Sequence, residues 1–135
     1  MSSLAIFDTS IFVDQLRTGR HTHRISSFVG LVRTSSVVLS ELWRGARNAA
    51  DREFLRKLAK NHQVLTPTER NWLESGQILS RIAENHGFLA EKLRDLHFDV
   101  LIALTARSVG ARLITTNRAD FELIKQYRNF EVDAW

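Results

Sequence analysis

The sequence predicts an α/β fold in which helices cover both faces of a central, mostly parallel sheet. Short apolar runs typical of buried strands alternate along the chain with stretches whose apolar residues recur every three or four positions, as in helices. Only one proline and six glycines occur among 135 residues, which argues against a loop-rich β architecture. Because no repeat, linker or low-complexity stretch interrupts this pattern, we predict a single domain over residues 1–135.

The composition is that of an ordinary soluble globular protein, with 44% hydrophobic and 25% charged residues. The absence of cysteine excludes a disulfide framework and a thiolate metal site, and it fits a reducing compartment. The apolar run at 4–7 is too short for a signal peptide, and no stretch approaches the ~20 apolar residues of a membrane span. We therefore expect a cytoplasmic protein.

The chain is basic, with a formal net charge of +4, and its arginines greatly outnumber its lysines. The planar guanidinium of arginine matches the geometry of phosphate, so this balance favours a polyanionic partner. A modestly basic surface without such a partner is the alternative.

In the first half of the chain we predict two buried strands that each end at a carboxylate. Asp8 follows the first strand and begins a turn into a helix, and Glu41 follows the second. The elements expected here are a strand at 4–7, a helix at 11–16, a weaker helix at 21–33, a strand within 34–39 that is centred on 36–39, a helix from residue 40 onward and a helix at 51–60.

A capping box marks the start of the next long helix. Thr66 is the expected N-cap, Pro67 takes the first helical position, Glu69 reaches back, and Gly87 ends the helix. Further elements are an edge strand at 64–65, an amphipathic helix or loop at 88–96, an apolar helix that Asp99 opens and Gly110 ends, a strand at 112–116, a helix at 121–127 and a strand at 130–132.

Four carboxylates are expected to gather at one end of this sheet. Asp8, Glu41 and Asp120 follow predicted strands, where open α/β sheets bind ligands, and Asp99 begins the neighbouring helix. At an effective dielectric near ~20, a like-charge pair at ~4 Å costs about 4 kcal/mol, so the cluster requires a cation. Ligands that are all oxygen select Mg²⁺ or Mn²⁺ rather than zinc.

Each acid also has a purely structural alternative. Asp8 and Asp120 could cap helices, and Glu41 could simply be a favourable charge near a helix start. Asp99 is the hardest to explain in this way, because its neighbours are apolar and no basic residue lies one helical turn away. Asp95 lies one turn before Asp99, so either of the two could face Asp8.

These motifs together resemble a PIN-domain ribonuclease, and the chain length and motif order resemble the VapC toxins of bacterial type II toxin–antitoxin pairs. The resemblance rests on Phe7-Asp8-Thr9-Ser10, Ser40-Glu41-Leu42, Asp99-Val100-Leu101-Ile102-Ala103 and the run from Thr115 to Phe121, and it covers essentially the whole chain. It implies a PIN-like fold in which Asp8, Glu41, Asp99 and Asp120 are the catalytic, metal-binding residues, supported by Thr9, Ser10 and Asn117.

The resemblance further implies a Mg²⁺- or Mn²⁺-dependent endoribonuclease, a hydrolase that cleaves RNA phosphodiester bonds with one or two metal ions and no covalent intermediate. It implies a cognate small antitoxin that holds the nuclease inactive, and a homodimer. Apolar positions such as Phe28, Trp43 and Phe54 are candidates for these contacts. The residues proposed to contact RNA are Arg17, Arg20, Arg24, Arg44 and Arg47, with simple surface charge as the alternative.

Other functions remain as alternatives. A stand-alone RNA-processing PIN nuclease and a non-catalytic PIN-like binding module share the same motifs. A phospho-acceptor receiver domain is disfavoured, because the Asp8 region carries a single acid and Thr115-Thr116-Asn117 supplies no lysine. His21 and His23 lack a third ligand for zinc, so we interpret them as solvated loop residues, and Asp14 and Glu91 as solvated or supporting residues.

Overall fold

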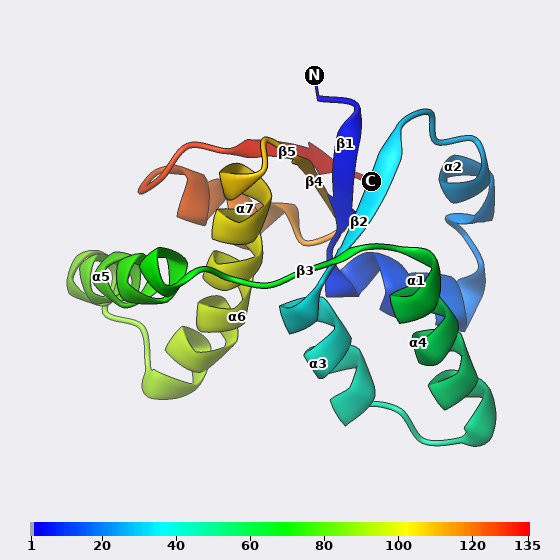
Figure 1. The fold of residues 1–135 in the computed structure, drawn as a ribbon. Coiled ribbons are helices and arrows are strands. Elements are labelled where there is room, and N and C mark those ends of the chain that lie inside the picture. The colour runs from blue at the N-terminus through cyan, green and yellow to red at the C-terminus, as the bar shows by residue number, and fades with distance from the viewer. Residues whose placement is uncertain (1) are drawn as a thin grey trace.

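A five-stranded parallel sheet forms the centre of the computed structural model, which describes residues 2–135 (Figure 1). The strands are β1 Leu4–Phe7, β2 Leu31–Ser35, β3 Val64–Leu65, β4 Arg112–Thr115 and β5 Glu131–Ala134. Their order is β3-β2-β1-β4-β5, and each neighbouring pair is parallel. The predicted α/β architecture is therefore confirmed.

The helices are α1 Thr9–Thr18, α2 Thr22–Ser26, α3 Ser36–Arg44, α4 Ala49–Asn61, α5 Glu69–His86, α6 Ala90–Ser108 and α7 Arg118–Lys125. Figure 1 shows α1, α3 and α4 grouped on one side of β1, and α5, α6 and α7 on the other. No helix within residues 2–135 has the length and apolar character needed to cross a membrane.

The order of the strands creates a switch point beside β1. The chain first builds outward through β2 and β3, and then returns to place β4 on the opposite side of β1. Ile6 is the shared centre of this arrangement, since it pairs with Arg33 of β2 and with Leu113 of β4. In open α/β sheets, ligands bind outside the carboxyl ends of strands at such a point.

The apolar run of α6 is buried, as predicted. Val100, Leu101, Ile102, Ala103 and Leu104 are all within 2% of complete burial. A helix that is apolar on every side in this way needs cover all around it. The helix is nevertheless longer than expected, because it begins at Ala90 and includes most of the predicted 88–96 segment. Asp99 therefore lies in the middle of α6 and does not open it.

A helix and a strand do occur within residues 21–39, but their predicted boundaries are wrong. The helix there is limited to α2, β2 occupies Leu31–Ser35, and the expected strand at 36–39 is the first part of α3. Val37, Val38 and Leu39 have the β-branched and apolar character of a buried strand, and such short runs are ambiguous. The Ser35 hydroxyl resolves the ambiguity, because it accepts hydrogen bonds from the amides of Val37 and Val38 and caps a helix.

The capping box of α5 is real but begins two residues later than predicted. Thr68 is the N-cap: its hydroxyl accepts from the Asn71 amide, and its own amide donates to Asn71 Oδ1, each over 3.0 Å. Thr66 instead accepts a hydrogen bond from the Ser36 hydroxyl. The predicted end at Gly87 is confirmed, and this glycine has the left-handed conformation of a helix C-cap, at φ 64°.

Two further boundaries near the C-terminus differ from the prediction. α7 begins at Arg118 after Asn117, so Asp120 lies in its first turn and is not its N-cap. The last strand runs over Glu131–Ala134 and not over 130–132.

Candidate active site

Asp8 occupies the switch point between β1 and β4. Its amide donates to the carbonyl of Ile114 over 2.8 Å, and the residue is only 3% exposed. Asp8 is also the N-cap of α1, because its Oδ2 accepts from the Ser10 amide. Asp8 therefore does cap a helix, as the structural alternative proposed. It is also buried at the end of the sheet where open α/β folds bind ligands.

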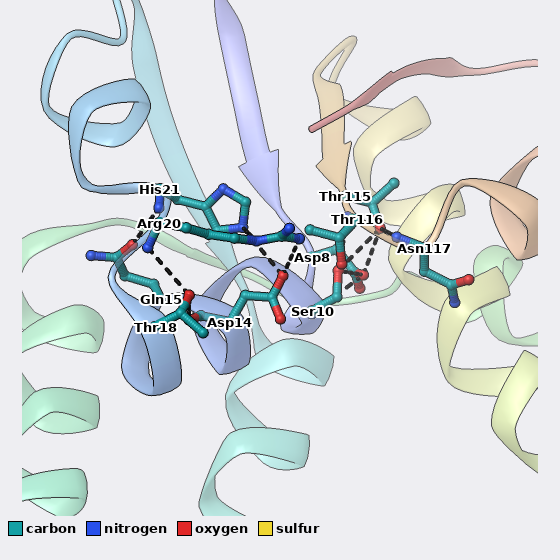
Figure 2. Close-up of polar contacts among 10 residues, drawn as sticks. All are labelled: Asp8, Ser10, Asp14, Gln15, Thr18, Arg20, His21, Thr115, Thr116 and Asn117. Carbon is teal, nitrogen blue, oxygen red and sulfur yellow. Dashed lines mark hydrogen bonds and ion pairs between the residues drawn. The ribbon is translucent and has the colours of Figure 1, made fainter.

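Two hydroxyls hold the same carboxylate oxygen of Asp8 (Figure 2). The hydroxyls of Ser10 and Thr115 donate to Oδ2 over 2.7 and 2.8 Å. Around them, the Thr116 amide donates to Ser10 Oγ and the Asn117 amide to Thr115 Oγ1. This network joins the start of α1 to the end of β4 and leaves Asp8 Oδ1 outside these bonds. Thr115 escaped the sequence analysis, although its place at the end of a strand beside Asn117 could have indicated it.

Glu41 reaches the site from the middle of α3 and not from the end of a strand, which corrects the prediction. Its Oε1 accepts a hydrogen bond of 2.8 Å from the Thr9 hydroxyl. Thr9 and Ser10 therefore divide their roles: Thr9 orients Glu41, whereas Ser10 orients Asp8. Since both hydroxyls belong to the first turn of α1, that turn links two of the four predicted acids.

Asp120 is held by two partners at the start of α7. Lys92 Nζ lies 2.8 Å from its Oδ1, and Asn117 Nδ2 donates to its Oδ2 over 3.0 Å. The predicted place of Asn117 beside this acid agrees with that contact. Sequence reasoning missed Lys92, although it precedes Asp99 by seven residues, or about two turns, on the same helix.

The pKa values of three acids are raised, because burial makes their charged forms unfavourable. Burial raises the pKa of Asp8, and the hydrogen bonds from Ser10 and Thr115 oppose it. Burial also raises the pKa of Glu41, where the Thr9 bond opposes the shift and the charge of Asp8 adds to it. Burial, followed by the charges of Asp8, Glu41 and Asp120, raises the pKa of Asp99 to about 8.

Asp120 behaves in the opposite way. Its burial acts to raise its pKa, but the hydrogen bonds from Lys92 and Asn117 and the charge of Lys92 outweigh that effect and lower it. The site therefore contains three carboxylates whose pKa values are raised and a fourth, Asp120, whose charge is paired with that of Lys92.

Asp99, and not Asp95, faces the other acids. Charges on Asp8, Glu41 and Asp120 all act on Asp99. Asp95 is exposed, and its charge acts on Glu41 from the rim. Asp95 lies one turn earlier on the same face of α6, so the position along the helix axis, and not the helical phase, decides which of the two lies opposite Asp8.

A cavity of about 450 Å³ extends from Glu41 between α1, α3 and α4. Arg17 and Arg47 lie on its wall together with Thr9 and Glu41. Its apolar lining is formed by Val13, Leu16, Leu42, Ala46 and Leu55. Of the five arginines predicted to contact RNA, Arg17 and Arg47 are therefore the ones that line this cavity.

The other three arginines are engaged elsewhere. Arg44 lies over the Phe98 ring at 5.4 Å, and its charge opposes the rise in the pKa of Glu41. Arg20 pairs with Asp14, and Arg24 lies over the Trp135 ring at 5.5 Å. Arg20 and Arg24 belong to the corner between α1 and α2 (Figure 2 shows Arg20 beside Asp14), and they do not join Arg17 and Arg47 in one patch.

His21 is buried, at 3% exposure, so its interpretation as a solvated residue is wrong. Its amide donates to Gln15 Oε1, its Nε2 lies 3.4 Å from Asp14 Oδ2, and its ring lies beside Trp135. His23 is exposed, as expected. Asp14 thus holds the turn between α1 and α2 together through Arg20 and His21, and its pKa is lowered because these two bonds outweigh the opposing effect of desolvation.

Of the apolar residues suggested for partner contacts, two serve this chain's own packing. Phe28 contacts Phe7, and Phe54 contacts Phe12, with ring centroids about 6 Å apart. Trp43 is 40% exposed and Trp72 is 52% exposed, so they are surface residues and not core residues. Trp43 therefore remains a candidate for contact with a partner.

The chemistry of the acids suits a hard divalent cation. The side chains that gather here offer carboxylate and hydroxyl oxygens, which Mg²⁺ and Mn²⁺ prefer, and their unbalanced negative charge calls for a cation. Within residues 2–135, no three Asp, Glu, His or Cys side chains stand in a ready-made coordinating arrangement.

Comparisons with known proteins agree with the fold. The family model described as the PIN domain matches residues 5–126. VapBC-1 from nontypeable Haemophilus influenzae superposes with a TM-score of 0.73 at 22% identity, covering 98% of each chain. VapBC2 from Rickettsia felis, solved with a bound DNA fragment from its promoter, superposes with a TM-score of 0.72 at 18% identity, covering 98% of each chain. FitAcB from Neisseria gonorrhoeae superposes with a TM-score of 0.68 at 21% identity, covering 95% of each chain. A search of curated proteins found no match.

Proposed function

This chain belongs to the PIN domain family, and on that premise we propose that it is a Mg²⁺- or Mn²⁺-dependent endoribonuclease, the VapC-type toxin of a toxin–antitoxin pair. The observation that carries the proposal is the environment of Asp99. This carboxylate lies in a buried helix, and burial together with the charges of Asp8, Glu41 and Asp120 raises its pKa to about 8. A divalent cation relieves such repulsion.

The residues that would hold the metal are Asp8, Glu41 and Asp99, with Asp120 as a further ligand or as the holder of a coordinated water. When bound, the metal polarises the scissile phosphate and lowers the pKa of a bound water. The chain's own hydroxyls orient its acids. The hydroxyls of Ser10 and Thr115 bind Oδ2 of Asp8, which leaves Oδ1 outside these two bonds, and the hydroxyl of Thr9 binds Oε1 of Glu41.

RNA is the substrate that the charge distribution favours. The net charge is +4 despite the acidic site, and Arg17 and Arg47 line the cavity that leads to Glu41. An RNA backbone bound by these guanidinium groups would lie beside the acids. The affinity of such binding falls strongly as the salt concentration rises. No covalent intermediate is required, because the activated water is the nucleophile.

For the partner we propose a small antitoxin protein that covers the cavity between α1, α3 and α4. The similar structure of VapBC-5 from Mycobacterium tuberculosis is described as a member of the VapBC family of toxin–antitoxin systems. The cavity has the apolar lining that an amphipathic segment would bury. A homodimer acting in the cytoplasm belongs to the same proposal. Trp43, which is partly exposed near the end of α3, is the side chain we assign to a protein contact.

The test is cleavage of a panel of structured RNAs with Mg²⁺ or Mn²⁺, comparing wild type with Asp8→Asn and Asp99→Asn. We expect discrete cleavage products from the wild type, loss of cleavage in EDTA, and a loss of at least a hundredfold in each variant. A variant of an exposed acid outside the site, Glu53→Gln, is the matched control and should cleave as the wild type does. Cleavage that survives EDTA and both site substitutions would contradict the metal mechanism.

A further inference from the structure

The basic side chain of Lys92 reaches the acidic site by direct contact, and none of the site's motifs includes it. Lys92 Nζ contacts Asp120 Oδ1 over 2.8 Å, while Asn117 occupies Asp120 Oδ2. The two side chains of the ion pair are 40% and 22% exposed for Lys92 and Asp120, so the contact is partly shielded from water. Both oxygens of Asp120 are therefore engaged by nitrogen donors of this chain.

The other acids are held differently. Asp8 accepts from the hydroxyls of Ser10 and Thr115, and Glu41 accepts from the hydroxyl of Thr9. A hydroxyl orients a carboxylate without cancelling its charge, whereas the ammonium group of Lys92 does both for Asp120. The four acids thus divide into three that still require a counter-ion and one that already has it.

Helix geometry explains how Lys92 comes to this place. Lys92 and Asp99 are seven residues apart in α6, which is about two turns, so they project from the same side of the helix. The same helix therefore presents a cation to Asp120 and a carboxylate to Asp8. Any shift in the phase of α6 would move both groups away from the site together.

The position of Lys92 is unfavourable for the helix itself. Lys92 is the third residue of α6, and the N-cap Leu89 supplies no side-chain hydrogen bond. The amino end of a helix carries partial positive charge, which repels a cation. The ion pair with Asp120 compensates for this unfavourable position. A need for a fixed positive charge beside Asp120 would explain why a lysine occurs here.

We propose that the ammonium group of Lys92 keeps Asp120 from binding the metal directly and restricts the site to one divalent ion held by Asp8, Glu41 and Asp99. Of the two roles proposed above for Asp120, this leaves that of holding a coordinated water. This inference rests on the proposed metal-dependent function and deepens it. Where many phosphodiesterases place a second metal ion, this chain supplies an ammonium group. Lys92 is accordingly a positioning residue that acts through Asp120.

The experiment counts metal ions. The metal-free full chain is titrated with Mn²⁺ by isothermal calorimetry, and free Mn²⁺ is followed by electron paramagnetic resonance. We expect one ion per chain in the wild type and in Lys92→Arg, which keeps the charge. Lys92→Met releases Asp120, and we expect it to bind two ions per chain. Lys57→Met, which removes an exposed lysine of α4, is the matched control and should bind one ion.

A second substitution assigns the new site to Asp120. Adding Asp120→Asn to Lys92→Met should return the stoichiometry to one ion, because the released carboxylate is then absent. Two ions bound by the wild type, or one ion bound by Lys92→Met with unchanged affinity, would overturn the inference. Should Lys92→Met fail to fold, anomalous diffraction from wild-type crystals soaked in Mn²⁺ gives the decisive count, because two Mn²⁺ peaks among the four acids exclude it.

The same proteins separate this inference from the proposed function. If the wild type cleaves RNA with Mn²⁺ but Lys92→Met still binds one ion with wild-type affinity, the role of Lys92 is wrong and the nuclease assignment stands. If the wild type binds no Mn²⁺ and Asp99→Asn leaves RNA cleavage unchanged, the role of Lys92 and the proposed nuclease function are both wrong.

Discussion

The hydroxyl of Thr115 donates to Asp8 Oδ2 across 107 residues of sequence, over 2.8 Å. This bond joins the carboxyl ends of β1 and β4, which are the two strands that flank the switch point. Ser10 binds the same oxygen from the first turn of α1. One buried carboxylate oxygen is thus the meeting point of three segments, and its orientation determines where the other oxygen can bind a metal.

Removing the Thr115 hydroxyl should destabilise the protein. Thr115→Val keeps the shape of the side chain but takes a donor from a buried carboxylate, and such losses cost about 1–3 kcal/mol. We expect a reduction of that size in the free energy of unfolding, measured by urea denaturation at pH 7. Thr115→Ser, which retains the hydroxyl, should recover most of it. An unchanged midpoint for Thr115→Val would show that Ser10 alone satisfies Asp8.

The metal-free protein should lose stability as the pH rises from about 4 toward 8. In the folded state the pKa of Asp99 is raised from its ordinary value of 3.8 to about 8, so the folded chain holds this proton more tightly than the unfolded chain does. Between these two values the unfolded state binds fewer protons. The free energy of unfolding should then fall by at most about 1.4 kcal/mol per pH unit from this group.

The raised pKa values of Asp8 and Glu41 also make the protein less stable as the pH rises. The Asp99→Asn variant is therefore needed to isolate the contribution of Asp99. We expect the pH dependence of stability to become flatter in the variant and its stability at pH 8 to exceed that of the metal-free wild type. Urea denaturation with EDTA across pH 5–8 measures both. Parallel curves for the two proteins would contradict the placement of Asp99 among like charges.

Divalent cations should stabilise the protein more at pH 8 than at pH 6. Binding requires the ionised form of Asp99, whose fraction in the metal-free protein is small at pH 6 and reaches about half near its pKa of about 8. Mn²⁺ at about a hundred times its dissociation constant should add roughly 2.7 kcal/mol to the free energy of unfolding. Thermal melts with Mn²⁺, with Ca²⁺ and with EDTA give the comparison. A Mn²⁺ effect that is equal in Asp99→Asn would place the ion elsewhere.

Arg17 and Arg47 should contribute to RNA affinity without affecting metal binding, because they line the cavity beside Glu41. Measured on the inactive Asp99→Asn background, each alanine substitution should weaken binding and reduce the slope of log affinity against log salt by about 0.7–1. Arg56→Ala, on the exposed side of α4, is the control and should change neither quantity. Equal effects from all three would indicate a diffuse basic surface and not a defined groove.

Gly30 should not tolerate alanine. Its φ is 141°, and an added Cβ would lie 2.1 Å from the Ser3 carbonyl oxygen, so the turn into β2 must distort. We expect Gly30→Ala to destabilise the protein by about 1–3 kcal/mol, the usual cost of such backbone strain. Gly76→Ala in the middle of α5 meets no atom within 4 Å. It should stabilise the protein by about 0.5–1 kcal/mol, and chemical denaturation compares the two.

The elements that the sequence predicts well are those whose local pattern agrees with their tertiary environment. The strand at Leu4–Phe7 and the buried run of α6 are apolar on every side, and the long α5 has clear periodicity and a terminal glycine. Residues 31–44 are different. There the apolar run at 37–39, with two β-branched valines, resembles a strand. The Ser35 cap and the pairing of β2 with β1 make this segment a helix. Strand propensity depends on such context and is not intrinsic to the run.

The sequence by itself determined the α/β alternation and the four acids at Asp8, Glu41, Asp99 and Asp120, because burial patterns and carboxylates can be read residue by residue. Tertiary structure alone decided how those acids are held. Glu41 approaches through α3 and not from a strand end, Thr115 binds Asp8 from a distant strand, and Lys92 neutralises Asp120. These are contacts between residues that are far apart in the chain, set by the phase of helices and the order of strands, and no local pattern encodes them.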